Sequence, residues 1–278
     1  MKQRDEKKQR VRRRLIIVLW LGLLSLVFIF TLVIPSVRQQ RSYEHLFTRG
    51  GDFELAPNWA SRLPYGVKHW LRERDVWMYL VRIEVLGGQG FTDADLVHVK
   101  GLAALKQLDL QNTNVGDAGL AHLKGMSSLE HLYLNQTQVS DAGLIHLKGL
   151  DSLDELDLSR TRISDAGLVH LEGMNGLKEL GLGETLVSDA GLIHLKGLTA
   201  LEILDLSETQ LSDAGLIHLK GMTALKELNV HGTQLSDAGL VHLKGLTSLK
   251  TLRIFKTNVS SVEELKTILP TLKIYFKN

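Results

Sequence analysis

Histidine recurs once every 24 residues through most of this chain, and histidine is the side chain most often used to bind metals or to move protons near neutral pH. A zinc site needs four ligands that converge at about 2.0–2.3 Å on one ion. No repeat places a cysteine or a carboxylate beside its histidine, and a helical wheel puts His194 on the outer flank, near the neighbouring helix or water. We therefore interpret these histidines as a repeated surface feature. They are His98, His122, His146, His170, His194, His218 and His242.

Three aspartates at every second repeat, Asp109, Asp157 and Asp205, are the other candidates for metal binding. If each repeat contributes one strand, neighbouring strands lie about 4.8 Å apart, so these carboxylates stand about 10 Å from one another. Calcium ligands lie about 2.3–2.6 Å from the ion, so the three aspartates cannot share one. The sequence also contains no glycine-rich phosphate loop and no G-x-S-x-G or H-E-x-x-H motif. These observations predict a protein that is not an enzyme and has no metal site and no cofactor.

The elements that must position these side chains repeat with the same period of 24 residues, without insertion or deletion. A constant period of this size predicts a solenoid, because each unit can bury its apolar face only against its neighbours. Aligned on the tetrad Asp-Ala-Gly-Leu, the seven units begin at Phe91, Val115, Val139, Ile163, Val187, Leu211 and Leu235.

Each unit contains two apolar patterns. Residues 201–206 follow L-x-x-L-x-L, whose alternation predicts a short strand. Residues 192–198 carry leucine at every third position, which favours one or two helical turns. We expect Ser188 or Asp189 to cap this helix, and Gly197 to end it in a left-handed conformation. The glycines expected to do so in all units are Gly101, Gly125, Gly149, Gly173, Gly197, Gly221 and Gly245.

The full pattern, L-x-x-L-x-L-x-x-T-x-V/L-S-D-A-G-L-x-H-L-K-G-L, resembles the leucine-rich repeat over residues 81–278. The half that contains the tetrad is similar to units of bacterial single-pass membrane-anchored leucine-rich repeat proteins, and also to the cysteine-containing repeats of F-box adaptors. The resemblance implies an α/β solenoid with a parallel sheet on its concave face and short helices on its convex face. It also implies recognition of another molecule without naming a ligand.

One position departs from the family pattern, where asparagine or cysteine is usual and this chain has threonine. A threonine hydroxyl can bond to backbone groups, so we expect a ladder of hydroxyls that contact the next turn in place of the usual ladder of amides. The threonines are Thr113, Thr137, Thr161, Thr185, Thr209, Thr233 and Thr257.

The first 34 residues predict a membrane anchor. Residues 1–14 hold eight lysines and arginines, and residues 15–34 are apolar without a charge, which is about the length that crosses a bilayer as a helix. Residues 15–34 are too long for the usual core of a cleaved signal peptide, so we predict an uncleaved signal anchor. The basic residues before the span favour a cytoplasmic N-terminus, which places the repeats in the periplasm or outside the cell. Without its first 14 residues the chain is mildly acidic, which argues against a nucleic-acid ligand.

The sequence therefore divides into six segments, and its lack of cysteine excludes a disulfide framework. Three of the four prolines fall in residues 35–64, which predicts a tether. A solenoid needs both ends covered, and the flanking segments supply candidates for this role. The segments are a basic cytoplasmic tail at 1–14, a transmembrane helix at 15–34, a tether at 35–64, an N-terminal cap with a first strand at 65–90, seven repeats at 91–258 and a C-terminal cap at 259–278.

The outward side chains of the strands are the positions free to differ between repeats, so we assign any specificity to them. Acidic groups occupy the middle strands, and Tyr133 and Phe255 near the two ends are large, rigid groups of the kind that anchor interfaces. Gly181 and Gly183 lack side chains, which predicts a shallow notch beside the neighbouring aspartates. The predicted contact residues are His131, Tyr133, Glu155, Asp157, Glu179, Gly181, Gly183, Asp205, Arg253 and Phe255.

These features predict a membrane-anchored protein that binds a protein or peptide through the concave sheet. Two alternatives stay open at this point. The array could be a passive structural or self-associating element of the cell envelope, or the chain could be an intracellular adaptor like the F-box proteins. The sequence indicates neither the partner nor the oligomeric state.

Overall fold

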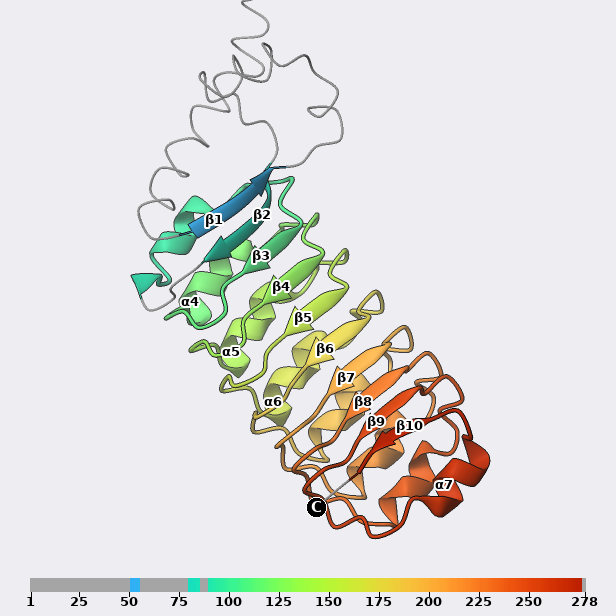
Figure 1. Cartoon of the computed structure of the whole chain (residues 1–278). Coiled ribbons are helices and arrows are strands. Elements are labelled where there is room, and N and C mark those ends of the chain that lie inside the picture. The colour runs from blue at the N-terminus through green and yellow to red at the C-terminus, as the bar shows by residue number, and fades with distance from the viewer. Residues whose placement is uncertain (1–50, 56–79, 86–89, 277–278) are drawn as a thin grey trace, which may run out of the picture. The chain divides into compact units, whose positions relative to one another are not determined.

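A computed structural model describes residues 51–55, 80–85 and 90–276 of the chain (Figure 1). Contacts divide the chain into two units, and all of the described residues belong to the unit formed by residues 46–55 and 80–278. The predicted tail at 1–14 and anchor at 15–34 lie outside the described residues, as do most of the tether and most of the N-terminal cap. Within the described ranges, no helix is long and apolar enough to span a membrane.

One sheet of ten strands runs through this unit in sequence order. The strand β1 pairs antiparallel with β2, and β2 to β10 pair parallel in an uninterrupted series. β1 falls within the segment that the sequence assigned to the tether, so part of that segment extends the sheet. The strands are β1 (Gly51–Leu55), β2 (Leu80–Val85), β3 (Gln107–Asp109), β4 (His131–Tyr133), β5 (Glu155–Asp157), β6 (Glu179–Gly181), β7 (Ile203–Asp205), β8 (Glu227–Asn229), β9 (Thr251–Arg253) and β10 (Lys273–Tyr275).

Short helices form a second layer along one side of the sheet, as Figure 1 shows, and we call this the helix side. In three repeats a single α-turn leads into a 3₁₀ turn, and in the next three the whole segment is 3₁₀. These helices are α4 (Asp117–Leu120), η5 (Ala121–Leu123), α5 (Asp141–Leu144), η6 (Ile145–Leu147), α6 (Asp165–Leu168), η7 (Val169–Leu171), η8 (Gly191–Leu195), η9 (Gly215–Leu219) and η10 (Gly239–Leu243). The first repeat contains η4 (Asp95–His98), and the C-terminal cap contains α7 (Glu263–Ile268).

The core lies between these two layers and consists mainly of leucine. Leu204 and Leu206 of one repeat point inward from the strand, and Leu192, Leu195 and Leu198 meet them from the helix side. All five are at most 1% exposed, as the two apolar patterns predicted. Because every repeat supplies apolar side chains at the same inward positions, neighbouring repeats bury one another without a separate core for each, which is the solenoid arrangement.

The aspartate of the tetrad joins each repeat to the next, and this corrects the predicted helix cap. Asp165 Oδ1 accepts a hydrogen bond from Ser188 N at 2.7 Å, and its Oδ2 accepts one from Ser188 Oγ at 2.6 Å. Asp189 likewise accepts from the serine 23 residues further on, so it does not cap its own helix. Ser188 Oγ does accept from Ala190 N at 3.3 Å. We call each of these connections between neighbouring repeats a rung. The residues that donate to the aspartates, in chain order, are Gly116, Ser140, Ser164, Ser188, Ser212, Ser236 and Ser260.

The threonines bond within their own repeats, which differs from the expected ladder between turns. Thr161 Oγ1 donates to the carbonyl of Leu158 at 2.5 Å, and every threonine of the row makes the same bond to the residue three positions before it. All seven threonines are buried. The hydroxyls therefore satisfy buried carbonyls where the chain leaves the strand, while the aspartates connect the turns.

The glycine after each helix has a left-handed conformation in most repeats but not in all. Gly173, for example, has φ 85° after Glu172 with ψ 131°, the angles of a type II turn. Gly197 and Gly245 do not have a positive φ, and the lysine before each of them keeps a helical ψ near −28° or −26°. The prediction for Gly197 is therefore wrong, because its turn stays in the right-handed region.

Candidate functional site

The outward side chains of the parallel strands form three rows across the sheet, and we call the surface they make the sheet face. The register pairs each row residue with its equivalent in the next repeat, as the repeat period predicted. The first row is Gln107, His131, Glu155, Glu179, Ile203, Glu227 and Thr251. The second row is Asp109, Tyr133, Asp157, Gly181, Asp205, Asn229 and Arg253. The third row, just beyond the strands, is Gln111, Asn135, Ser159, Gly183, Ser207, His231 and Phe255.

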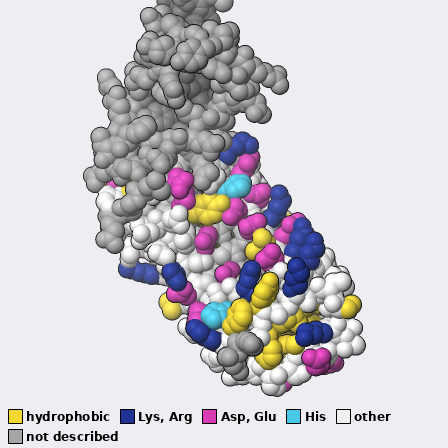
Figure 2. Space-filling view, in the orientation of Figure 1, with side chains coloured by type: hydrophobic (Ala, Val, Ile, Leu, Met, Phe, Trp, Pro, Cys, Tyr) yellow, Lys and Arg dark blue, Asp and Glu magenta, His cyan; other side chains and the backbone are white. Residues whose placement is uncertain are grey.

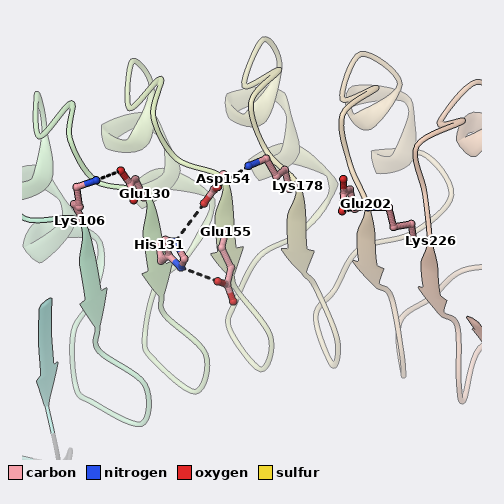
Figure 3. A network of polar contacts seen from close by, with 8 residues as sticks. All are labelled: Lys106, Glu130, His131, Asp154, Glu155, Lys178, Glu202 and Lys226. Carbon is pink, nitrogen blue, oxygen red and sulfur yellow. Dashed lines mark hydrogen bonds and ion pairs between the residues drawn. The ribbon is translucent and has the colours of Figure 1, made fainter. Parts of the chain in front are cut away.

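Acidic side chains gather toward the N-terminal strands of this face, and hydrophobic ones toward the C-terminal strands (Figure 2). In the acidic part, His131 lies between two carboxylates of the next repeat (Figure 3). Its Nδ1 is 2.9 Å from Glu155 Oε2, and its Nε2 is 3.6 Å from Asp154 Oδ1. Asp154 also pairs with Lys178 at 3.0 Å, so one carboxylate connects three repeats.

The residue before each first-row position adds a row of charges that our sequence reasoning missed. Lys106 pairs with Glu130, and Lys226 pairs with Glu202, each across one period (Figure 3). This row could have been found in the sequence, because charged residues of both signs at a constant step of 24 residues lie beside one another on parallel strands. These pairs fix long side chains along one margin of the sheet face. The full row is Lys106, Glu130, Asp154, Lys178, Glu202, Lys226 and Lys250.

Tyr133 stands at the centre of the acidic part. Partial burial raises the pKa of its hydroxyl well above the ordinary value, and a hydrogen bond to Glu155 and the nearby charges of Asp109 and Glu179 act in the same direction. The hydroxyl therefore stays neutral and donates to Glu155. A neutral, fixed phenol surrounded by carboxylates offers a flat apolar surface with a negative rim, a combination that suits a cationic or amide-rich segment.

Burial also raises the pKa of Glu179, and repulsion from Glu155 and Asp154 adds to it, whereas His131 opposes it. Because the folded state raises this pKa, Glu179 favours folding below the ordinary glutamate pKa, and that contribution is lost as the pH rises through the raised value. We expect Glu179→Gln to increase the thermal unfolding midpoint near neutral pH and to leave it unchanged in acid, where Glu179 itself is protonated. Glu263→Gln on α7 is the matched control, and an equal gain for Glu179→Gln at both pH values would contradict this assignment.

The aspartates of the second row are partly engaged by their own turns. Asp157 Oδ1 accepts from Ser159 N at 2.9 Å, and Asp205 Oδ1 accepts from Ser207 N at 2.8 Å. Each therefore holds the chain as it leaves the strand, a role that the sequence analysis did not assign to it. Asp157 and Asp205 are also partly exposed, so these two residues combine a local role with a place on the sheet face.

The predicted notch at Gly181 and Gly183 is occupied by neighbouring side chains. A Cβ at Gly181 would lie 2.3 Å from Asp157 Oδ1, and one at Gly183 would lie 2.9 Å from Ser207 Oγ. The two glycines make room for polar groups of the adjacent strands, and Gly183 is itself buried. The prediction of an open notch is therefore wrong, although Gly181 still lies in the second row.

Aromatic rings and an arginine gather at the C-terminal end of the sheet face. Phe255 lies 5.9 Å from the His231 ring in an edge contact and 6.3 Å from the Tyr275 ring. The Arg253 guanidinium lies 5.9 Å from the centre of the Tyr275 ring. Tyr275 belongs to the C-terminal cap, so a search confined to the repeats did not find it. The predicted contact residues Arg253 and Phe255 are thus brought together, whereas His131 and Tyr133 lie with Glu155 and Glu179 at the other end.

The histidine row lies on the helix side, away from this face. Its members are partly buried, and His194 Nδ1 is 2.6 Å from Glu172 Oε1 of the preceding repeat, in agreement with the expected contact to a neighbouring helix. Among the described residues, no group of three or more histidine and acidic side chains could hold a metal ion.

Two family models match the chain. One, described as a leucine rich repeat, covers residues 103–163, and another with the same description covers residues 197–219. No curated protein matches it. Among solved structures, the crystal structure of an internalin C2 from Listeria monocytogenes is similar to this chain, with a TM-score of 0.60 and 24% identity. The similarity covers 70% of this chain and 80% of the internalin chain.

Proposed function

We propose that this chain, which is a leucine-rich repeat protein, binds another protein through its sheet face and presents that face from a membrane. One observation carries the binding part of the proposal. The inward positions are apolar in every repeat and mostly leucine, whereas the outward rows change in chemical type from strand to strand. The outward rows include Tyr133 and Glu155 toward the N-terminal strands and Arg253 and Phe255 toward the C-terminal ones. A uniform scaffold with a variable surface supports recognition through that surface.

The contacts on the sheet face favour a rigid binding surface. Polar contacts between repeats hold His131, Glu155 and Lys178, and turn hydrogen bonds hold Asp157 and Asp205. Side chains that are already ordered lose less entropy on binding, which increases affinity. The acidic part around Tyr133 favours a partner segment that carries lysine or arginine, since opposite charges guide the encounter.

The test is photo-crosslinking in cells from Ile203, in the middle of the sheet face, with the full chain. The native protein should capture a partner that the variant Tyr133→Ala with Glu155→Lys and Glu179→Lys loses. Truncating an interface anchor costs about 2 kcal/mol or more, or about thirtyfold in affinity. Glu172→Lys on the helix side is the control with the same kind of charge change. Equal capture by all three proteins, or capture of nothing, would favour a passive element of the envelope.

The membrane part of the proposal rests on the sequence of residues 15–34 and on the basic residues before it. A reporter fused after residue 278 tests it. Alkaline phosphatase, which is active outside the cytoplasm, should be active in this position. A high-salt wash should release a chain that lacks residues 1–41 from the membrane fraction and should leave the full chain there. A fusion whose phosphatase is inactive, while a cytoplasmic fluorescent reporter in the same place fluoresces, would favour an intracellular adaptor instead.

A further inference from the structure

The helix side carries a row of exposed aliphatic side chains, one in each repeat. They stand directly before the histidine of each helix, and their exposed fractions lie between 42% and 53%, with Ala121 as the small exposed member. Single exposed aliphatic residues are common, but a complete row at one position of every repeat makes a continuous apolar stripe along the solenoid. The row is Val97, Ala121, Ile145, Val169, Ile193, Ile217 and Val241.

Lysines form a second row beside this stripe, three residues after each aliphatic position. In six of the seven repeats this residue is lysine, and Glu172 is the exception. Residues three apart on a helical turn are neighbours on its surface, so each charge stands next to an exposed aliphatic group. Lys244 pairs with Glu264, and the other five lysines are exposed. The row is Lys100, Lys124, Lys148, Glu172, Lys196, Lys220 and Lys244.

The lysine row of the helix side and the first two rows of the sheet face therefore differ in the sign of their charge. The first two rows of the sheet face hold six carboxylates, and Arg253 is the one lysine or arginine within those two rows. The helix side presents its lysine row, whereas the aspartates at the start of its helices each accept hydrogen bonds from the next repeat. An anionic surface would attract the helix side and repel the sheet face, and both effects orient the molecule in the same direction. The six carboxylates belong to Asp109, Glu155, Asp157, Glu179, Asp205 and Glu227.

The uniformity of the stripe indicates what kind of target it fits. A protein partner presents different groups at different places, and a surface that binds one usually differs from repeat to repeat, as the sheet face does. A stripe with an aliphatic side chain in every repeat and a lysine beside six of the seven matches a target that is the same everywhere along its length. A lipid surface has this property.

We propose that the helix side lies on an anionic lipid surface, such as one rich in phosphatidylglycerol, with the aliphatic stripe at the boundary between headgroups and acyl chains. The lysines extend to the lipid phosphates while their stems stay on the apolar stripe. The sheet face is then turned away from the bilayer and is open to other molecules. This arrangement does not require the sheet face to bind a protein, so the two proposals can fail separately.

The absence of cysteine from the chain allows single labels to test this orientation. We would place a nitroxide at Ile193→Cys on the helix side or at Gln111→Cys on the sheet face, in the full chain reconstituted in vesicles. In vesicles that contain phosphatidylglycerol, the label at 193 should become accessible to oxygen and protected from a water-soluble paramagnetic reagent. The label at 111 should stay in water. In vesicles of phosphatidylcholine alone, both labels should stay in water.

A matched pair of variants separates the lysine row from the net charge of the chain. Each lysine near an anionic membrane contributes about a fivefold preference, so Lys148→Gln with Lys196→Gln and Lys220→Gln should reduce the ratio of lipid-contacting to free label about a hundredfold. The control replaces Lys106, Lys226 and Lys250 beside the sheet face with glutamine, and it should change this ratio little. Equal loss in both variants would overturn the proposal. The proposal would also be overturned if the label at 193 were protected from the water-soluble reagent to the same extent in neutral vesicles, and if this protection depended on protein density. That result would indicate contact between copies of the chain.

Discussion

Replacing Gly191 with alanine is expected to lower the free energy of unfolding by about 3 kcal/mol, since overpacking in a closed site and the loss of charged hydrogen bonds each cost up to about that much. A Cβ at this position would lie 2.4 Å from Asp165 Oδ1 and 3.0 Å from Asp165 Cα. The carboxylate could move away, but it would then lose its two bonds to Ser188. Urea unfolding of the full chain in mild detergent, followed by circular dichroism, measures the loss.

Gly197→Ala in the same repeat is the control for this experiment. No atom lies within 4 Å of the position of a Cβ at Gly197, and its φ is not positive, so alanine fits there without strain. This variant should unfold at the same urea concentration as the native chain or at a slightly higher one, because alanine has less backbone freedom than glycine when unfolded. If the two variants unfold together, the contact with Asp165 does not explain why glycine stands at 191.

Removing the carboxylate is the second change with a large expected effect. Asp165→Ala removes two hydrogen bonds to a charged acceptor and should cost about 2–4 kcal/mol. Asp165 and Gly191 touch, so their effects should not add. Without the Asp165 carboxylate, the Cβ of alanine at 191 no longer meets the atom that lies closest to it. The free energy of unfolding of the double variant should therefore exceed the value expected from adding the two single effects by about 1 kcal/mol or more. Asp151→Ala, at an exposed loop position, is the control. Additive effects within about 0.5 kcal/mol would contradict this coupling.

The sequence predicted the solenoid, the inward leucines and the register of the outward rows, because all three follow from a constant period. It did not predict the role of Asp165, since Asp-Ala-Gly-Leu also looks like the beginning of an isolated helix, where an acidic residue acts as a cap. The partner, Ser188, is 23 residues away and adjacent only after the repeats stack. The same pairing recurs at the same separation of 23 residues in successive repeats.

The candidate site was less predictable than the scaffold. The repeat period predicts which residues lie side by side, but it does not predict the direction in which each side chain points. Gly181 appeared to leave a space, yet Asp157 fills it. The rings of Phe255 and Tyr275 meet because the cap adds a strand, and this contact lies outside the repeat pattern. The row that contains Asp154 and Lys178 could have been predicted, since it has the same step as the others, but we followed only the positions expected to point outward.

The rungs between aspartate and serine have a consequence for how such a chain can change in length. Each rung joins an acceptor in one repeat to a donor in the next, and the glycine that makes room for it is also supplied by the next repeat. A duplicated block of 24 residues therefore contains the serine that donates to the preceding repeat and the glycine that makes room for this bond. It also contains an aspartate that accepts from the following repeat. Whole copies can be gained or lost without creating a mismatched junction, whereas a block cut at any other length would separate these partners. The solenoid can therefore lengthen by duplication of whole repeats without losing a hydrogen bond between repeats. The length of the sheet face can change in this way while the contacts that hold neighbouring repeats together stay the same.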